Sequence, residues 1–134
     1  MHAVDTYDYA VIRVVPRVER EEFVNVGIVL SCPALRFLQA RIELDAMRLL
    51  AIDPAIDLDT VRRHLAAIPA ICAGTPGSGP IGQLPQRARF HWLVAPRSSI
   101  IQTSPVHMGR CSDPGATIEH LLATMVRTLQ VNPS

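Results

Sequence analysis

Two apolar runs near the start of the sequence predict a pair of long neighbouring strands. Residues 7–15 and 23–30 are rich in β-branched and aromatic side chains, which suit the packed surface of a sheet. Neither run alternates cleanly between apolar and polar positions, so we expect both faces of the pair to be covered. The segment between them, residues 16–22, is too charged to be buried and too short for a parallel crossover. The pattern therefore predicts a hairpin in the middle of a sheet.

Three further strands are predicted downstream of this hairpin. Residues 35–44 alternate in part between apolar and polar side chains, which indicates a strand near an edge with one face in water. Residues 89–95 and 100–104 are predicted as two more strands that are joined by a tight connection. Residues 105–111 are expected to form a loop or a short extension.

Capping residues and apolar stripes predict the helices. Asp45 can cap a short helix over residues 46–52, and Asp113, which a proline follows, can start the last helix. Between them, apolar residues recur at helical spacing over residues 58–72, and Pro69 is expected to kink or break that helix. The predicted fold class is α+β, a mostly antiparallel sheet of about five strands with two to three helices packed chiefly on one face.

Length and composition indicate one globular domain. The 134 residues, 49% hydrophobic and 19% charged, suit a single domain over residues 1–134. No apolar run approaches the roughly 20 residues that span a bilayer, and the first residues carry neither a basic segment nor an apolar signal core. We therefore expect a cytoplasmic protein that does not contact membranes. A net charge of +1 gives no general attraction to nucleic acid either.

The basic residues are all arginine, and this removes several classes of enzyme. Without lysine the chain cannot form a Schiff base, a phosphate-binding P-loop or the lysine-dependent triad of restriction-type nucleases. The glycine-rich stretch at residues 74–82 is accordingly expected to be a surface loop. Cys32, Cys72 and Cys111 are odd in number and far apart, so we expect free thiols, no metal site and no cofactor.

Two polar residues, Arg13 and Asn25, interrupt the apolar hairpin. The simplest register places them opposite one another on one face, with Tyr9 further along that face and Val11 opposite Gly27. An arginine on a central strand needs acceptors, because a buried charge without a partner is costly. The hairpin face is therefore a candidate binding site.

A second group of hydrogen-bonding side chains spans residues 89–113, and its members are Arg89, Trp92, Arg97, Ser98, Ser99, Gln102, Ser104, His107 and Asp113. Arg97 lies in a turn beside Ser98, an arrangement that suits the binding of phosphate or carboxylate by a planar guanidinium and a hydroxyl group. Gln102 and Ser104 add further hydrogen-bonding groups, and His107 is the candidate general acid or base.

The two arginines, if they come together, require something negative between them. Glu22 or Asp113 could supply that charge within the protein, in which case Arg13 and Arg97 would be structural. The other possibility is a bound anion. The sequence leaves both alternatives open.

Four longer motifs cover nearly the whole chain. They are YxYAVIRVVP at 7–16, EFxNVG at 22–27, RxxWLxAPRS at 89–98 and QxSPxHxG at 102–109, and an Asp-Pro pair follows at 113–114. This set resembles the bacterial family catalogued as domain of unknown function 3037. One departure is Glu21, where the family pattern would have a glycine in an exposed turn.

The resemblance implies a small stand-alone protein of a family without a settled activity. It also implies that some members are encoded beside kinases that resemble the HipA-type toxin, with a HipA-like kinase as a partner. Our leading hypothesis is a cytoplasmic binding or regulatory module whose anion site forms where the hairpin face meets residues 97–107. The alternative is a hydrolase or transferase acting on a phosphorylated or nucleotide-like substrate, with His107 as general acid/base and Arg13 and Arg97 holding the anion.

Overall fold

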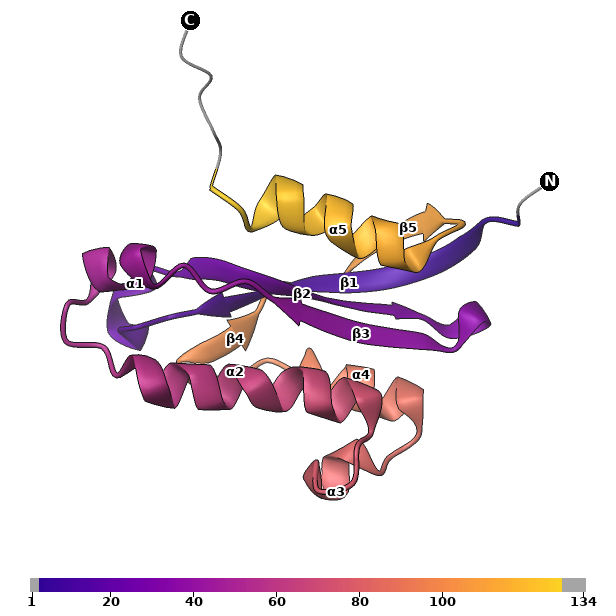
Figure 1. Ribbon diagram of the computed structural model, residues 1–134, viewed down its shortest axis with the longest axis horizontal. Coiled ribbons are helices and arrows are strands. Elements are labelled where there is room, and N and C mark those ends of the chain that lie inside the picture. Colours follow the sequence, from indigo (N-terminus) through magenta and orange to yellow (C-terminus); the bar gives the residue numbers. More distant parts are fainter. Residues whose placement is uncertain (1–2, 129–134) are drawn as a thin grey trace, which may run out of the picture.

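A five-stranded antiparallel sheet forms the middle layer of the molecule, with helices above and below it (Figure 1). The computed structural model describes residues 3–128. The strands are β1 (Asp5–Val14), β2 (Val24–Cys32), β3 (Phe37–Ile42), β4 (Ile101–Thr103) and β5 (His107–Cys111). The helices are α1 (Ala46–Ile52), α2 (Leu58–Ala73), α3 (Gly79–Gly82), α4 (Gln86–Leu93) and α5 (Pro114–Met125). Short 3-10 turns at Val18–Arg20 and Pro33–Leu35 complete the two hairpin connections.

Strand β1 is the centre of the sheet, as the sequence predicts. It pairs with β2 on one side, and β2 pairs with β3, which forms an edge of the sheet. On its other side β1 pairs with β4 near its end and with β5 near its start. Ser104 lies in the interruption between these two short strands, where its backbone N–H donates to Val11 O at 2.8 Å and its Oγ accepts from Val11 N at 2.9 Å.

The hairpin register changes by one residue within β2. Arg13 lies opposite Asn25, which confirms the predicted pairing of these two polar residues. Ile12, however, lies opposite Gly27, so Val26 is an extra residue in β2, a β-bulge. Val11 therefore faces Ile28, and its predicted pairing with Gly27 is wrong. A side chain at position 27 would clash, since a Cβ there would lie 2.6 Å from the Arg41 backbone oxygen.

Both faces of the sheet are covered by helices. On one face α2 and α4 pack over a large apolar cluster, and on the opposite face α5 packs over a smaller one (Figure 1). The predicted number of two to three helices is wrong, because residues 3–128 form five helices, of which α5 alone packs over the cluster on the second face. The residues of β1 and β2 on that face are apolar and need cover: Tyr9, Val11, Ile28 and Leu30.

Helix α4 lies where a strand was predicted. Within residues 89–95 the helical period places Phe90 and Leu93 in the core, and Arg89 donates to the backbone oxygens of Ile71 and Cys72 at the end of α2. The prediction of a strand over these residues is wrong, since periodicity alone separates short buried helices and strands poorly. The missing strand is supplied by β5, in the segment predicted as a loop or short extension.

The predicted helix starts are confirmed. The side chains of Asp45 and Asp113 accept hydrogen bonds from backbone N–H groups in the first turns of α1 and α5, and Asp57 does the same for α2. Helix α2 is not broken at Pro69 but continues to Ala73, where Gly74 ends it in a left-handed conformation. Among the helices of residues 3–128, none is long and apolar enough to cross a membrane.

Candidate functional site

Arg13 and Arg97 line one pocket at the hairpin end of the sheet. The pocket has a volume of about 460 Å³, and its remaining lining residues are Val15, Val18, Glu21, Phe23, Ser98 and Gln102. Three segments meet there. Arg13 of β1 pairs with Gln102 of β4, the loop between α4 and β4 provides Arg97 and Ser98, and the hairpin turn provides the others. Four of the polar residues that the sequence singled out thus lie around a single hollow.

The Arg13 guanidinium stacks on an aromatic ring and forms no ion pair within the described residues. Its central carbon lies 4.0 Å from the centroid of the Phe23 ring, a cation–π geometry. Within residues 3–128 Arg13 forms no ion pair, and its Nε is buried without a hydrogen-bond acceptor. Burial lowers the pKa of this guanidinium from its usual value, as expected for a charge taken out of water.

The acidic residues that could have neutralised Arg13 are engaged elsewhere. Glu22 accepts from Arg20 Nε at 2.5 Å, and Asp113 accepts from the backbone N–H of Ala116 as the cap of α5. Glu21 is the one carboxylate among the lining residues, and it is exposed and forms no ion pair within the described chain. The internal pairing that the sequence left open is therefore absent from residues 3–128.

Asn25 ties the end of α5 to the sheet. Its Nδ2 donates to the backbone oxygen of Met125 at 3.0 Å, whereas its Oδ1 is buried without a donor among the described residues. The unpaired Oδ1 and the unpaired Nε of Arg13 belong to directly opposed residues. Asn25 is therefore paired with a lining residue of the pocket, Arg13, but does not line the pocket itself.

Arg97 is held in place by helix α4. Its guanidinium stacks over the Trp92 ring, 4.1 Å from the centroid, and donates to the backbone oxygens of Leu93, at 3.3 Å, and of Trp92. These carbonyls end the helix, where a cation is favourable. An arginine has five N–H donors, so Arg97 can cap α4 and still bind an anion. Gln102 is fixed in a similar way, because its Nε2 donates to Ser99 O at 2.8 Å.

Three of the predicted site residues lie away from this pocket. Tyr9 is buried under α5, and its ring lies 5.4 Å from the ring of His107 in a tilted arrangement. His107 is exposed on β5 and does not line the pocket of Arg13. Ser104 is buried and bonded to β1, which gives it a structural role. The structure therefore does not bring the candidate acid/base His107 to the two arginines.

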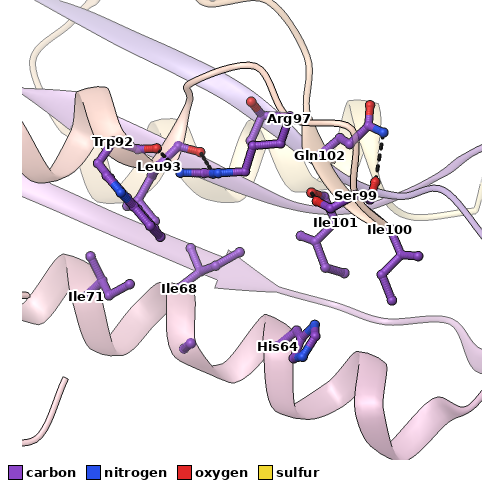
Figure 2. Close-up of a pocket in the computed structure, with 12 residues that line it drawn as sticks. His64, Ile68, Ile71, Trp92, Leu93, Arg97, Ser99, Ile100, Ile101 and Gln102 are labelled. Carbon is purple, nitrogen blue, oxygen red and sulfur yellow. Dashed lines mark hydrogen bonds between the residues drawn. The ribbon is translucent and has the colours of Figure 1, made fainter. Parts of the chain in front are cut away.

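A second, apolar cavity lies on the other side of Arg97 and Gln102. Figure 2 shows it between α2 and the segment that leads into β4, with Ile68 and Ile71 facing Trp92 and Ile101 across it. Its volume is about 230 Å³. The other lining residues are His64, Ala67, Leu93, Arg97, Ser99, Ile100, Gln102 and Thr103. Arg97 and Gln102 belong to the linings of both hollows.

Sequence reasoning named Trp92 but missed Phe23 and the apolar side chains of both hollows. Phe23 was assigned to a strand, but it is 44% exposed and stacks on Arg13. Trp92 was expected in a strand, and its position in α4 instead leaves it 40% exposed beside Arg97. The one sequence signal for such a lining residue was a large aromatic side chain next to a charged turn. This signal applies only to Phe23.

The thiols offer no further chemistry at the site. Cys32 and Cys72 are buried and Cys111 is half-buried, and all three are free. Burial raises the pKa of the Cys72 thiol to about 12, so this sulfur is protonated and unreactive near neutral pH. Within residues 3–128 no three histidine, cysteine or acidic side chains are grouped in a way that could hold a metal ion.

Comparison with known proteins gives one finding. No curated protein and no solved structure matches the chain significantly. A protein-family model does match, and it covers residues 9–126, which include every residue of the two hollows described above. The resemblance noted from the four sequence motifs is thereby confirmed, and the chain belongs to the family described as "Protein of unknown function (DUF3037)".

Proposed function

We propose that this protein is a small binding module that holds an anionic ligand between Arg13 and Arg97. The observation that carries the proposal is the state of Arg13, which is partly buried, stacked on Phe23 and without an acidic partner in the described chain. A partly desolvated guanidinium without an acceptor for its buried Nε costs stability. A bound anion would remove this cost and accept hydrogen bonds from the unpaired donor.

The surrounding groups suit a phosphate or carboxylate group. Arg97 lies in the same pocket, already oriented by the end of α4, so little side-chain entropy is lost when it binds. The hydroxyl of Ser98 and the amide of Gln102 add neutral hydrogen-bonding groups to the lining. Guanidinium groups bind such oxyanions through paired, charge-assisted hydrogen bonds.

The test is a thermal melt of the purified protein with increasing inorganic phosphate or sulfate. A ligand that binds only the folded protein stabilises it, by about 1.4 kcal/mol at ten times the dissociation constant. For a domain of this size, that corresponds to a rise in Tm of about 5 °C. We expect this rise for the native protein and its loss in Arg13→Gln, which removes the charge from a side chain that already contacts solvent.

Arg62→Gln is the matched control. Arg62 is an exposed arginine on α2 that lines neither hollow, so the variant has the same net charge as Arg13→Gln and should keep the full response to phosphate. If both variants reduce the response equally, the effect is one of general charge, and the proposed site is wrong. If the native protein shows no shift with either anion, the proposal also fails.

A further inference from the structure

We infer that the ligand at Arg97 is a small amphipathic anion, whose apolar body lies in the cavity between α2 and β4. This inference rests on the proposed anion site and adds the class of molecule that the site would take. The body is a single ring or a short alkyl chain, and the head is a carboxylate or another oxyanion. The argument uses the chemistry of the lining, the size of the cavity and the position of the charges.

The lining of the cavity is predominantly apolar. Helix α2 contributes Ala67, Ile68 and Ile71 from one side, and the segment entering β4 contributes Ile100 and Ile101 from the other (Figure 2). The ring of Trp92 and the side chain of Leu93 close the end that lies toward α4. Such a surface gains free energy when an apolar group replaces water on it.

The size of the cavity limits the occupant to a small molecule. An apolar protein cavity of about 150 Å³ is large enough to hold a benzene molecule. The present cavity, at about 230 Å³, therefore has room for one aromatic ring or a short chain of methylenes. It is below the roughly 300–1,000 Å³ of typical sites for drug-sized ligands. A helix or a folded partner could not enter it.

The charged groups of the cavity select a negative head. No carboxylate lines it, and Arg97 is the charged side chain of its lining. Arg97 and Gln102 also line the neighbouring pocket of Arg13. A head bound at Arg97 thus lies at the boundary of the two hollows, with an apolar space on one side and a second guanidinium in the pocket on the other. This position suits a molecule with one apolar end and one anionic end.

A series of straight-chain carboxylates, from acetate to octanoate, tests the inference. Trp92 is the only tryptophan of the chain and lines the cavity, so its fluorescence reports occupancy directly. We expect the dissociation constant to fall about fourfold for each added methylene until the cavity is full, and then to level off. Benzoate should bind more tightly than acetate and should also change the Trp92 emission.

Two neighbouring alanines on α2 provide a matched pair of variants. Ala67 lines the cavity, whereas Ala66 does not, and both are exposed positions in a helix that tolerate leucine. Ala67→Leu should place a side chain in the cavity and abolish the dependence on chain length, while the Tm response to phosphate is retained. Ala66→Leu should bind the whole series as the native protein does.

The outcomes separate this inference from the proposed function. If phosphate raises Tm through Arg13 but the dissociation constants do not change with chain length, the anion site is correct and the amphipathic ligand is wrong. Equal effects of Ala66→Leu and Ala67→Leu would also overturn the inference, because the cavity would then not be the site of the chain. If no anion binds at all, both proposals fall.

Discussion

The two faces of the sheet are covered to different extents. On the α2 side, helices α2 and α4 contribute to a core of 14 buried residues, among them Leu65 and Phe90. On the α5 side a single helix of 12 residues covers a cluster of nine buried residues. Helix α5 ends at Met125, where Asn25 donates to its backbone oxygen. Arg13 and Phe23, at the hairpin end of the sheet, lie outside the cluster that α5 covers within residues 3–128, and we call this region the open corner.

This difference explains where the polar residues of the hairpin are. A helix long enough to cover the second face completely would bury Arg13 and leave its charge without water or a partner. Because α5 ends beside Asn25, Arg13 instead faces a pocket. Gln102 of the edge strand β4 and Arg97 of the loop before this strand also line the pocket. Within the described residues the open corner thus lies past the end of α5, and it coincides with the proposed anion site.

The largest effect is expected when the same truncation is made under each face of the sheet, in Leu65→Ala and in Leu122→Ala. Both leucines are almost fully buried, one under each face. Leucine-to-alanine changes in a core cost about 2–5 kcal/mol, and the cost is lower where the surroundings can collapse into the cavity. We expect Leu65→Ala near the upper end of this range, because several helices fix its site, and Leu122→Ala near the lower end.

Chemical denaturation with urea measures both free energies of unfolding. The native protein and the two variants should have the same dependence on urea concentration, so that the midpoints alone report the difference. Equal costs, or a larger cost for Leu122→Ala, would show that α5 is held as rigidly as the opposite layer. The open corner would then need an explanation other than a thin second layer.

The elements with strong local signals could be predicted from the sequence. The central hairpin has long apolar runs, and the helix starts at Asp45 and Asp113 have a capping side chain, so their positions follow from nearby residues alone. The opposition of Arg13 and Asn25 also followed, because it lies on the turn side of the bulge at Val26. Beyond the bulge the predicted register was off by one residue.

The remaining errors concern features that depend on distant parts of the chain. Helix α4 is fixed by contacts of Arg89 with the end of α2 and by Arg87, which donates to Asp8 of β1 at 2.6 Å. No local pattern shows such contacts. Likewise, Phe23 joins the candidate site because the hairpin turn meets β4 and the loop before it, a meeting that only the tertiary fold determines.

A smaller effect is expected at Glu21, in the turn that borders the open corner. Its backbone is left-handed, with φ at 59°, a conformation that costs a non-glycine residue about 1–2 kcal/mol. Glu21→Gly should therefore raise the free energy of unfolding by about 0.5–1 kcal/mol, after the greater entropy loss of glycine is subtracted. Removal of a carboxylate from the lining should also tighten phosphate binding, by about twofold for an exposed charge.

Arg36 provides the comparison for Glu21. It has φ at 50° in the β2–β3 connection, and it lines neither hollow. Arg36→Gly should stabilise the protein by a similar amount and leave phosphate binding unchanged. Urea denaturation and phosphate titration of both variants separate the two effects. If Arg36→Gly also binds phosphate more tightly, or if Glu21→Gly binds it no more tightly than the native protein, the Glu21 carboxylate does not act on the pocket.

The smallest effect concerns the charges that hold the end of the α5 layer. Arg127, just after α5, donates to both carboxylate oxygens of Glu43 at 2.8 Å and to Glu119 at 2.6 Å. These hydrogen bonds hold the pKa values of Glu43 and Glu119 below the usual 4.5. A carboxyl group with a lowered pKa in the folded state stabilises the protein above its unfolded pKa. That contribution is lost as the pH falls below about 4.5 and through the folded values.

Arg127→Met should therefore be less stable than the native protein at pH 7, and the difference should shrink as the pH falls below 4.5. The effect is modest, because all three side chains are more than one-third exposed and water screens their charges. Urea denaturation between pH 3 and pH 7 measures it, and Arg62→Met controls for the loss of one positive charge. If the difference in free energy of unfolding between the native protein and Arg127→Met does not vary with pH, Arg127 fixes α5 by packing alone. The charges around Arg127 would then not contribute to the difference between the two layers, and the faces would differ in extent of cover only.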